Sequence, residues 1–125
     1  MSGLTLDTGA LIAIEREDRR VARLLEKARQ RQLWIAIPAG ALGQAWRGGA
    51  RQVPLARFLA LPEVEIEILD EMRARQAGQL CGIRGTSDVI DASVVLCAKA
   101  RGHRIITSDP EDLSRLDPTA ELIVV

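Results

Sequence analysis

Short apolar stretches alternate with helix-like stretches along the whole of this 125-residue chain, and this order most restricts the folds open to it. Strands joined by helical connections pair in parallel, because each crossover returns the chain to the same end of the sheet. The alternation therefore predicts one α/β domain over residues 1–125, with a mostly parallel sheet and helices on both faces. The expected strands cover residues 3–7, 33–37, 63–69, 103–109 and 121–125; the expected helices cover residues 8–31 (one or two helices), 38 to the glycine pair at 48–49, 54–61, 70–80, 86–100 and 110–116.

Composition excludes several classes of protein. No stretch approaches the roughly 18 apolar residues of a membrane span, and Asp7 interrupts the first apolar segment, so neither a membrane protein nor a secretory signal is expected. Cys81 and Cys97 lack the spacing of metal or redox motifs, which favours reduced thiols and a cytoplasmic location. The net charge is zero, so bulk electrostatic attraction to nucleic acid is not expected.

Four aspartates are predicted to meet at one edge of the sheet. Asp7 and Asp109 each end an expected strand, and Asp88 and Asp91 begin the apolar helix that leads into the strand before Asp109. Residues three apart share a helix face, and the carboxyl ends of parallel strands are where α/β proteins place their sites. The sequence therefore predicts a cluster of carboxylates at the carboxyl edge.

Each aspartate also has a purely structural explanation. Asp109 before Pro110 has the pattern of a helix N-cap. Asp88 could cap its own helix with Asp91 in the capping-box position, and Asp7 could be a turn residue. Capping does not require all four at one edge, however, and clustered carboxylates repel one another, so one would hold a proton unless a cation neutralises them.

The residue types of the cluster indicate which cation it would bind. Oxygen-only ligands suit Mg²⁺, with Mn²⁺ as a substitute, whereas Zn²⁺ prefers His or Cys. The single histidine, His103, is expected in a surface turn at the opposite edge. Thr8 and Ser108, beside Asp7 and Asp109, are candidates to hydrogen-bond the ligands from a second shell. A carboxylate site that holds Mg²⁺ serves phosphoryl chemistry.

Four segments, in this order and spacing, resemble the PIN-domain ribonucleases. They are LDTGALIA, IPAGALGQAWRG, DVIDASVVLCAKARG and IITSDPEDL, and together they span nearly the whole chain. Length and element order resemble the small stand-alone members, the VapC-type toxins of bacterial toxin–antitoxin pairs. The resemblance implies a three-layer α/β/α sandwich and a Mg²⁺-dependent endoribonuclease that uses metal-activated water. It also implies RNA as substrate, inhibition by a cognate antitoxin, and a homodimer.

The resemblance also assigns residues. Asp7 matches the first acidic position of the family, Asp91 the aspartate of its helix motif, and Asp109 the last acidic position, while Asp88 matches an additional acid that some members carry. Gln44 stands where the family usually has glutamate. Its amide offers an oxygen but no charge, which is expected to affect the binding of a second metal ion and the catalytic rate, and not the fold.

Two other functions remain open from the sequence. Gln44 also fits a non-catalytic PIN-like module that binds RNA or a protein through a degraded metal site. A receiver-like or small-ligand domain with an acidic pocket would need a lysine opposite its aspartate. Lys27 and Lys99 both fall in expected helices, so this last alternative is the least favoured.

Overall fold

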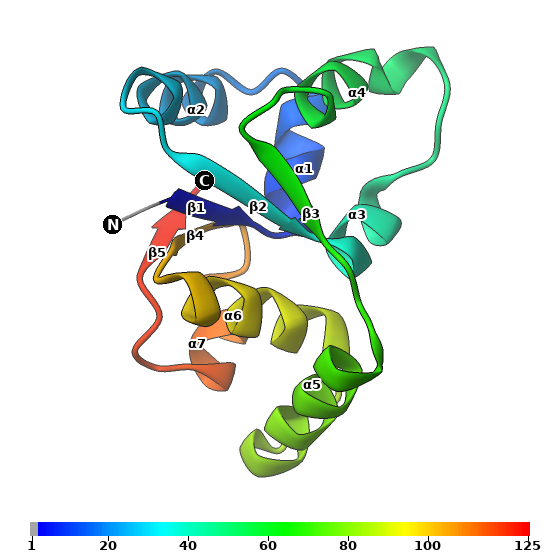
Figure 1. Ribbon diagram of the computed structural model, residues 1–125, viewed down its shortest axis with the longest axis vertical. Helices are drawn as coiled ribbons and strands as arrows, with labels where there is room; N and C mark the ends of the chain where they lie inside the picture. Colours follow the sequence, from blue (N-terminus) through cyan, green and yellow to red (C-terminus); the bar gives the residue numbers. More distant parts are fainter. Residues whose placement is uncertain (1–2) are drawn as a thin grey trace.

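The computed structural model describes residues 3–125 and is built on a five-stranded sheet in the order β3-β2-β1-β4-β5. Every neighbouring pair of strands is parallel, as the alternation of elements predicts. Figure 1 shows the strands crossing the middle of the molecule, with the start of β1 near the N-terminus. The strands are β1 (Gly3–Leu6), β2 (Trp34–Pro38), β3 (Val64–Glu67), β4 (Arg104–Thr107) and β5 (Leu122–Val124).

Helices cover both faces of the sheet, which confirms the three-layer α/β/α sandwich (Figure 1). One face carries α1 (Thr8–Glu15), α2 (Arg19–Gln30) and α4 (Val53–Leu59). The other carries α5 (Glu71–Arg84), α6 (Val89–Arg101) and α7 (Pro110–Leu116). The short helix α3 (Ala39–Ala45) continues directly from β2, and the 3₁₀-helix η1 (Ala50–Gln52) precedes α4.

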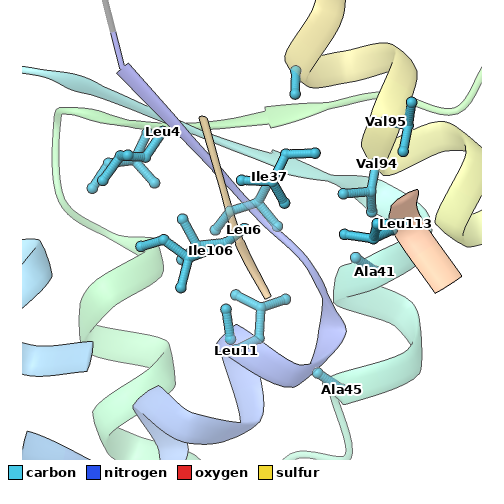
Figure 2. Packing of buried hydrophobic residues seen from close by; sticks show 14 of the residues in the cluster. Leu4, Leu6, Leu11, Ile37, Ala41, Ala45, Val94, Val95, Ile106 and Leu113 are labelled. Atoms are coloured by element: carbon cyan, nitrogen blue, oxygen red, sulfur yellow. The ribbon is translucent and has the colours of Figure 1, made fainter. Parts of the chain in front are cut away.

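The core lies between the sheet and these helices. Leu6, Ile37 and Ile106, from three adjacent strands, are fully buried, and Leu11 of α1 and Val94 of α6 close on them from the two faces (Figure 2). Burying a side chain of this size stabilises the fold by about 1.5–3 kcal/mol. Since α6 packs against both β1 and β2, the core holds the first turn of α6 in place at the sheet edge.

The end of α3 differs from the prediction that the glycine pair ends it. The helix stops at Ala45, before Gly48 and Gly49, because the buried side chain of Gln52 supplies its last hydrogen bonds. The Gln52 amide donates to the Ala45 carbonyl (2.8 Å) and accepts from the backbone N–H groups of Arg47 and Gly48 (2.7 Å each). A side chain seven residues beyond Ala45 therefore caps the end of the helix.

Other element boundaries shift by a few residues. The strand expected over residues 63–69 ends at Glu67, and the helix expected to end at residue 80 continues to Arg84, where Gly85 takes the left-handed conformation that closes a helix (φ 70°). The helix expected from residue 86 begins at Val89. Within residues 3–125, none of the helices has the length and apolar character needed to cross a membrane.

Candidate functional site

The four predicted aspartates follow strands or begin helices at the carboxyl edge of the sheet. Asp7 follows β1, and its backbone N–H donates to the Ile106 carbonyl of the neighbouring strand β4 (3.2 Å). Asp109 follows β4 after one intervening residue. Asp88 and Asp91 lie at the start of α6, which packs against both α3 and α7. Three segments of the chain therefore bring carboxylates to one edge.

Asp7 is the most buried of these acids, with 3% of its surface exposed. It occupies the N-cap position of α1, where its carboxylate accepts the backbone N–H of Ala10 (2.9 Å), so it is a helix cap and not the turn residue proposed as one alternative. Burial raises the pKa of Asp7 above its ordinary value, and the negative charge of Asp109 adds to this rise. Hydrogen bonds from Thr107, Ala10 and the Ser108 backbone oppose the rise without cancelling it.

Thr107, which the sequence analysis did not select, links two of the acids. Its fully buried hydroxyl is hydrogen-bonded to the Asp7 carboxylate and accepts the backbone N–H of Asp109 (2.8 Å). The Ser108 hydroxyl instead lies against the start of α1, 1.8 Å from where a β-carbon on Gly9 would stand. Only glycine at position 9 allows this close approach of the loop after β4 to α1.

Asp88 and Asp91 form the capping arrangement that their spacing predicts. Asp88 is the N-cap of α6, and its carboxylate accepts the backbone N–H of Asp91 (2.9 Å). Asp91 is partly buried, and its pKa is raised from 3.8 to about 7 by burial and then by the negative charges of Asp88, Asp112, Asp7 and Asp109. Asp91 is therefore about half-protonated near neutral pH when no cation offsets these charges.

Asp109 occupies the N-cap position of α7, as its place before Pro110 indicates, but its side chain accepts no capping hydrogen bond from the described residues of that helix. The purely structural alternative for Asp109 therefore accounts for its position and not for its carboxylate. Its backbone has φ −124° and ψ 64°, and its own N–H donates to the Thr107 hydroxyl oxygen. The exposed carboxylate therefore stays available to a ligand. Asp112, three residues further along α7, is a fifth acid whose charge acts on Asp91; its helical spacing from Asp109 is the signal that could have identified it.

Gln44 and Thr8 contact each other beside Asp7. The Thr8 hydroxyl donates to the Gln44 side-chain oxygen (2.6 Å), and this bond joins the first turn of α1 to α3. Gln44 itself is exposed. The side chain at position 44 is therefore bonded to the residue that follows Asp7, at the rim of the acidic cluster.

The donor set of this edge fits a hydrated Mg²⁺ ion. Its side chains offer oxygen only, and the raised pKa values of Asp7 and Asp91 reflect burial and negative charge that a cation would offset. Among residues 3–125, no three His, Cys, Asp or Glu side chains are placed so that they could enclose a metal ion together. Mg²⁺ usually keeps several waters and binds through one or two carboxylates plus substrate phosphates, so these acids suit it better than a metal that must be fully enclosed.

The remaining candidate groups lie outside this cluster. His103 is at the opposite edge as predicted, but it is partly buried instead of being a free surface turn residue: its Nδ1 is hydrogen-bonded to the Thr5 hydroxyl (3.1 Å), and burial lowers its pKa. Lys27 and Lys99 lie near the C-terminal ends of α2 and α6, which lead to the starts of β2 and β4. The receiver-like alternative therefore finds no lysine facing the acids among the residues that the structure describes.

Comparison with known proteins identifies a protein family whose sequence profile matches this chain. The sequence profile of the PIN domain matches residues 4–117, and a search of curated protein sequences gave no significant match. Among solved structures, VapBC2 from Rickettsia felis bound to a DNA fragment from its promoter is 19% identical, with a TM-score of 0.71 over 98% of both chains. A toxin–antitoxin complex from Klebsiella pneumoniae is 20% identical, with a TM-score of 0.70 over 98% of this chain and 97% of that one.

A third similar structure, DNA-bound VapBC from Salmonella typhimurium, is 19% identical, with a TM-score of 0.69 over 99% of this chain and 98% of that one. At these identities the structural similarity establishes the fold alone. The profile match covers all but the first residue of β1, the four aspartates, and the helices α1, α6 and α7 that begin beside them. The chain belongs to the PIN domain family.

Proposed function

We propose that this protein is a Mg²⁺-dependent endoribonuclease and the toxin of a VapC-type toxin–antitoxin pair. The single observation that carries the proposal is the meeting of Asp7, Asp88, Asp91 and Asp109 at the carboxyl edge of a PIN domain, with the pKa of Asp91 raised to about 7. Carboxylates that lie close together repel one another, and a bound cation offsets this repulsion.

The acids have different parts in this proposal. Asp7 and Asp91, which are the more buried, would hold the metal ion, and Asp88 and Asp109 would bind its waters or add negative charge. When bound, Mg²⁺ lowers the pKa of water and stabilises charge on phosphate oxygens; Mn²⁺ would substitute. Thr107 orients Asp7 through its hydroxyl, which keeps the carboxylate in a single position before a metal arrives.

The similar solved structures support a partner protein for this chain. One is a toxin–antitoxin complex and two are VapBC proteins bound to DNA, so we propose that a cognate antitoxin binds and inhibits this chain. We also propose that the chain acts in the cytoplasm as a homodimer without a membrane partner. Expressed alone, the chain is expected to be toxic or poorly soluble, and co-expressed with its antitoxin it is expected to purify as a complex. Benign soluble expression of a monomer with full nuclease activity would contradict this part.

The test is RNA cleavage by the purified chain, freed of antitoxin, with and without Mg²⁺. Asp7→Asn and Asp91→Asn are expected to abolish cleavage and to leave the fold intact. Asp18→Asn is the matched control for Asp7→Asn, because Asp18 caps α2 through the same bond to the backbone N–H three residues on (3.0 Å), and asparagine caps a helix as well as aspartate does. Cleavage at the wild-type rate by either site variant would refute the assignment.

Product ends test the chemistry separately. Attack by water in line with the 3′-oxygen would leave 5′-phosphates on the products. A 2′,3′-cyclic phosphate would instead identify the ribose hydroxyl as the nucleophile and would remove the proposed role of the acids. End-labelling of the products with and without phosphatase treatment distinguishes the two.

Gln44 favours a second candidate function, an RNA- or protein-binding PIN module without catalysis. The amide gives no negative charge at the rim of the cluster, where it is held by Thr8. This alternative predicts that the chain binds RNA or a protein partner but does not cleave RNA with Mg²⁺ or with any other divalent cation. A preparation that cleaves RNA only when Mg²⁺ is added would exclude it.

A further inference from the structure

A tryptophan ends the short helix that begins at the acidic edge of the sheet. Trp46 is the C-cap of α3, where its backbone N–H donates to the Leu42 carbonyl (2.8 Å), and 41% of its surface is exposed. Two residues earlier, the Gln44 side chain is bonded to Thr8, the residue that follows Asp7. A helix of this length spans about 10 Å, so Trp46 is close enough to the acids for one nucleic-acid strand to contact both.

The surface beside this tryptophan is open. Gly43 lies three residues before Trp46 on α3, and residues at this spacing are neighbours on a helix surface. No atom of another element within residues 3–125 lies within 4 Å of where a β-carbon on Gly43 would stand. The loop after α3 runs along the outside of the molecule towards α4 (Figure 1). Large aromatic side chains usually bury their rings, so packing accounts for only part of the position of Trp46.

Arg47, the next residue, places a positive charge beside Trp46. It is exposed, and its Nη1 donates to the carbonyl oxygens of Trp46 (2.6 Å) and Gly43 (3.4 Å) at the end of α3. A cation at this place also interacts favourably with the helix dipole. Within residues 3–125, none of the ion pairs involves Arg47. Since a guanidinium has five N–H donors, the Nε and Nη2 groups of Arg47 can still bind a phosphate.

A buried amide holds the backbone on both sides of Trp46. Gln52 is 3% exposed and uses all four hydrogen-bonding positions of its side chain. Its oxygen accepts the backbone N–H groups of Arg47 and the following glycine (2.7 Å each), and its nitrogen donates to the Ala45 carbonyl (2.8 Å) and the Glu15 carboxylate (2.6 Å). The loop is therefore fixed before any ligand arrives, which lowers the entropy lost on binding.

We propose that Trp46 and Arg47 bind an unpaired nucleotide of the RNA beside the segment at the acids, with its base on the indole and its phosphate on the guanidinium. The inference rests on the proposed function, since it takes RNA as the ligand, and it adds the substrate class, RNA with an unpaired base at this place. Proteins hold single strands by stacking bases on aromatic rings next to cations, with little dependence on sequence. Bases of loops and single-stranded ends can be splayed out onto a ring in this way.

The test measures binding of the full chain to a short single-stranded RNA in EDTA, which suppresses metal-dependent cleavage. Trp46→Leu is expected to bind about ten-fold more weakly with an unchanged salt dependence, and Trp46→Phe, which keeps a ring, within about three-fold of the wild type. Arg47→Gln is expected to lower the slope of log affinity against log salt by about 0.7, the value for one phosphate contact on a single strand. The wild type is expected to bind the same RNA more weakly once it is annealed to its complement.

The second of the two tryptophans in the chain supplies the control. Trp34 begins β2 at the opposite edge and is 58% exposed, so Trp34→Leu removes an accessible indole outside the proposed surface and should leave RNA binding unchanged. RNA should quench the fluorescence of Trp34→Phe, in which Trp46 is the remaining tryptophan, and should leave that of Trp46→Phe unchanged. Arg23→Gln, which removes an exposed arginine of α2, is the control for Arg47→Gln.

Several results would overturn the inference. They are normal RNA binding by Trp46→Leu, an equal loss in Trp34→Leu, equal binding of paired and unpaired RNA, and absence of RNA binding by the wild type. Quenching of Trp34 in place of Trp46 would also overturn it. A Trp46→Leu protein that binds RNA normally but no longer co-purifies with an antitoxin would assign the indole to a protein interface and would refute the RNA contact.

Cleavage assays on the same proteins separate this inference from the proposed function. If the wild type does not cleave RNA but RNA still quenches Trp46 and Trp46→Leu still binds weakly, the nuclease proposal fails and the stacking surface stands. If the wild type cleaves RNA with Mg²⁺, Trp46→Leu is expected to raise KM with kcat little changed, because the stacked base is held equally in the ground and transition states. Cleavage with unaltered KM and unaltered binding in Trp46→Leu would refute the surface alone.

Discussion

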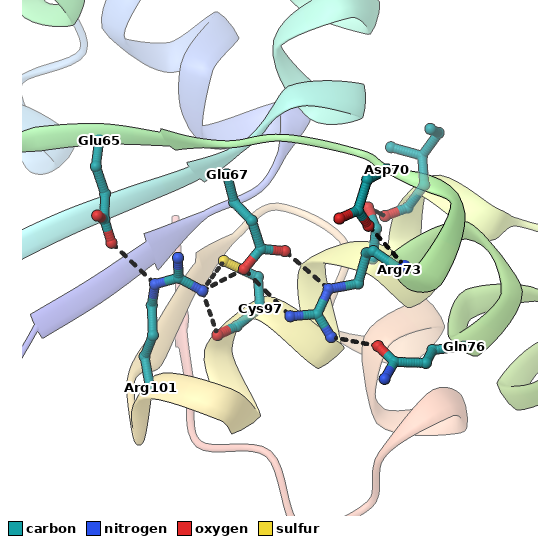
Figure 3. Close-up of polar contacts among 9 residues, drawn as sticks. Glu65, Glu67, Asp70, Arg73, Gln76, Cys97 and Arg101 are labelled. Atoms are coloured by element: carbon teal, nitrogen blue, oxygen red, sulfur yellow. Dashed lines mark hydrogen bonds and ion pairs between the residues drawn. The ribbon is translucent and has the colours of Figure 1, made fainter.

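Two groups of partly buried carboxylates in this protein have opposite electrostatic surroundings. At the edge strand β3, Glu67 accepts hydrogen bonds from Arg73 (2.9 and 3.3 Å) and from Arg101, which also binds Glu65 (2.9 Å) (Figure 3). Burial alone would raise the pKa of Glu67, but the two guanidinium groups outweigh burial and lower it. At the carboxyl edge, burial and neighbouring acids both raise the pKa of Asp91, to about 7.

The described part of the chain supplies its own positive charges beside Glu67 but not beside Asp91. The β3 group, Glu65, Glu67, Arg73 and Arg101, ties the edge strand to α5 and α6 with charges that the chain itself supplies. Among residues 3–125, no cation is one of the main groups that shift the pKa of Asp91 or of Asp7. The first group is complete and structural, whereas the second would gain a counter-charge from the Mg²⁺ ion that we propose.

Removing a guanidinium from the β3 group has the largest expected effect on the free energy of unfolding. Arg101→Ala leaves Glu65 without its partner and Glu67 with one guanidinium. We expect a loss of about 2–3 kcal/mol in the free energy of unfolding, because the Arg101–Glu67 pair is largely shielded from water, whereas the half-exposed Glu65 contributes little. Urea unfolding at neutral pH measures it. The folded pKa of Glu67 is lowered from its usual 4.5, so this contribution is present above pH 4.5 and lost as the pH falls through the folded pKa.

Arg75→Ala is the control for this loss. Arg75 pairs with Glu71 (2.8 Å) on the same helix that carries Arg73, but both side chains are mostly exposed, so little change in stability is expected. Equal losses for the two variants would mean that the β3 group is not stabilised by its burial.

Removing a charge from the acids around Asp91 should raise stability, whereas Arg101→Ala lowers it. Asp91→Asn is expected to increase the free energy of unfolding in EDTA near pH 8 by about 1–2 kcal/mol after allowance for solvent screening. The folded pKa of about 7 exceeds the usual 3.8. The Asp91 charge therefore lowers the free energy of unfolding of the wild type by its full amount above pH 7, and has no effect on it below about pH 3.8. The difference between the two proteins should therefore disappear as the pH falls towards 4.

Asp70→Asn provides the comparison for this gain. Asp70 caps α5 by accepting the backbone N–H of Arg73 (2.9 Å) and lies outside the acidic cluster, so its substitution should leave stability unchanged at both pH values. A stability gain for Asp91→Asn that persists at pH 4 would show that charge repulsion is not its cause.

Protons and Mg²⁺ should compete at the acids around Asp91. Since Asp91 holds a proton below about pH 7, the affinity for Mg²⁺ is expected to fall about ten-fold between pH 8 and pH 6. The number of protons released per ion bound is expected to be about 0.9 at pH 6 and about 0.1 at pH 8. Titration calorimetry in buffers of different ionisation enthalpy measures both quantities. Asp91→Asn should abolish the pH dependence, and a wild-type affinity that does not change with pH would place Asp91 outside the metal site.

Local patterns in the sequence were sufficient to predict the arrangement of elements. Apolar periodicity and strand-helix alternation predicted the parallel sheet, and the three-residue spacing of Asp88 and Asp91 predicted the cap on α6. These features depend on residues close together in the chain, so their information is present in short segments. The position of Asp7 at the carboxyl edge followed from the same reasoning, because a residue that ends a parallel strand can lie nowhere else.

Features that depend on distant residues were missed. Thr107 was not selected because nothing in its surroundings along the chain indicates that its hydroxyl contacts Asp7 on another strand. The end of α3 was predicted at the glycine pair, whereas the buried amide of Gln52 ends it earlier. His103 was expected to be a free surface residue, but the pairing of β1 with β4 places it against Thr5. The tertiary fold brings Thr107 and His103 to their partners, whereas Gln52 reaches the end of α3 across the short loop between them.

The smallest expected effect concerns Gln44, which the sequence resemblance places where the family usually has glutamate. Gln44→Glu adds a negative charge at the rim of the acidic cluster, and a glutamate there can still accept the Thr8 hydrogen bond. Because position 44 is exposed, the added charge is expected to tighten Mg²⁺ binding by only about two- to five-fold, in keeping with the roughly 0.2–1 kcal/mol of exposed charge pairs. Catalytic activity should be unchanged or higher.

A double-variant cycle decides whether Gln44 belongs to the site. Asp88→Asn should weaken Mg²⁺ binding, and it should do so more in the natural chain than in the Gln44→Glu background, since each acid supplies charge that the other otherwise lacks. Gln30→Glu, which adds the same charge to an exposed position on α2 near the amino edge, serves as the control and should leave Mg²⁺ binding unchanged. If Gln44→Glu binds Mg²⁺ as the wild type does and shows no coupling to position 88, the Gln44 side chain only links α1 to α3, and the departure from the family has no bearing on the metal.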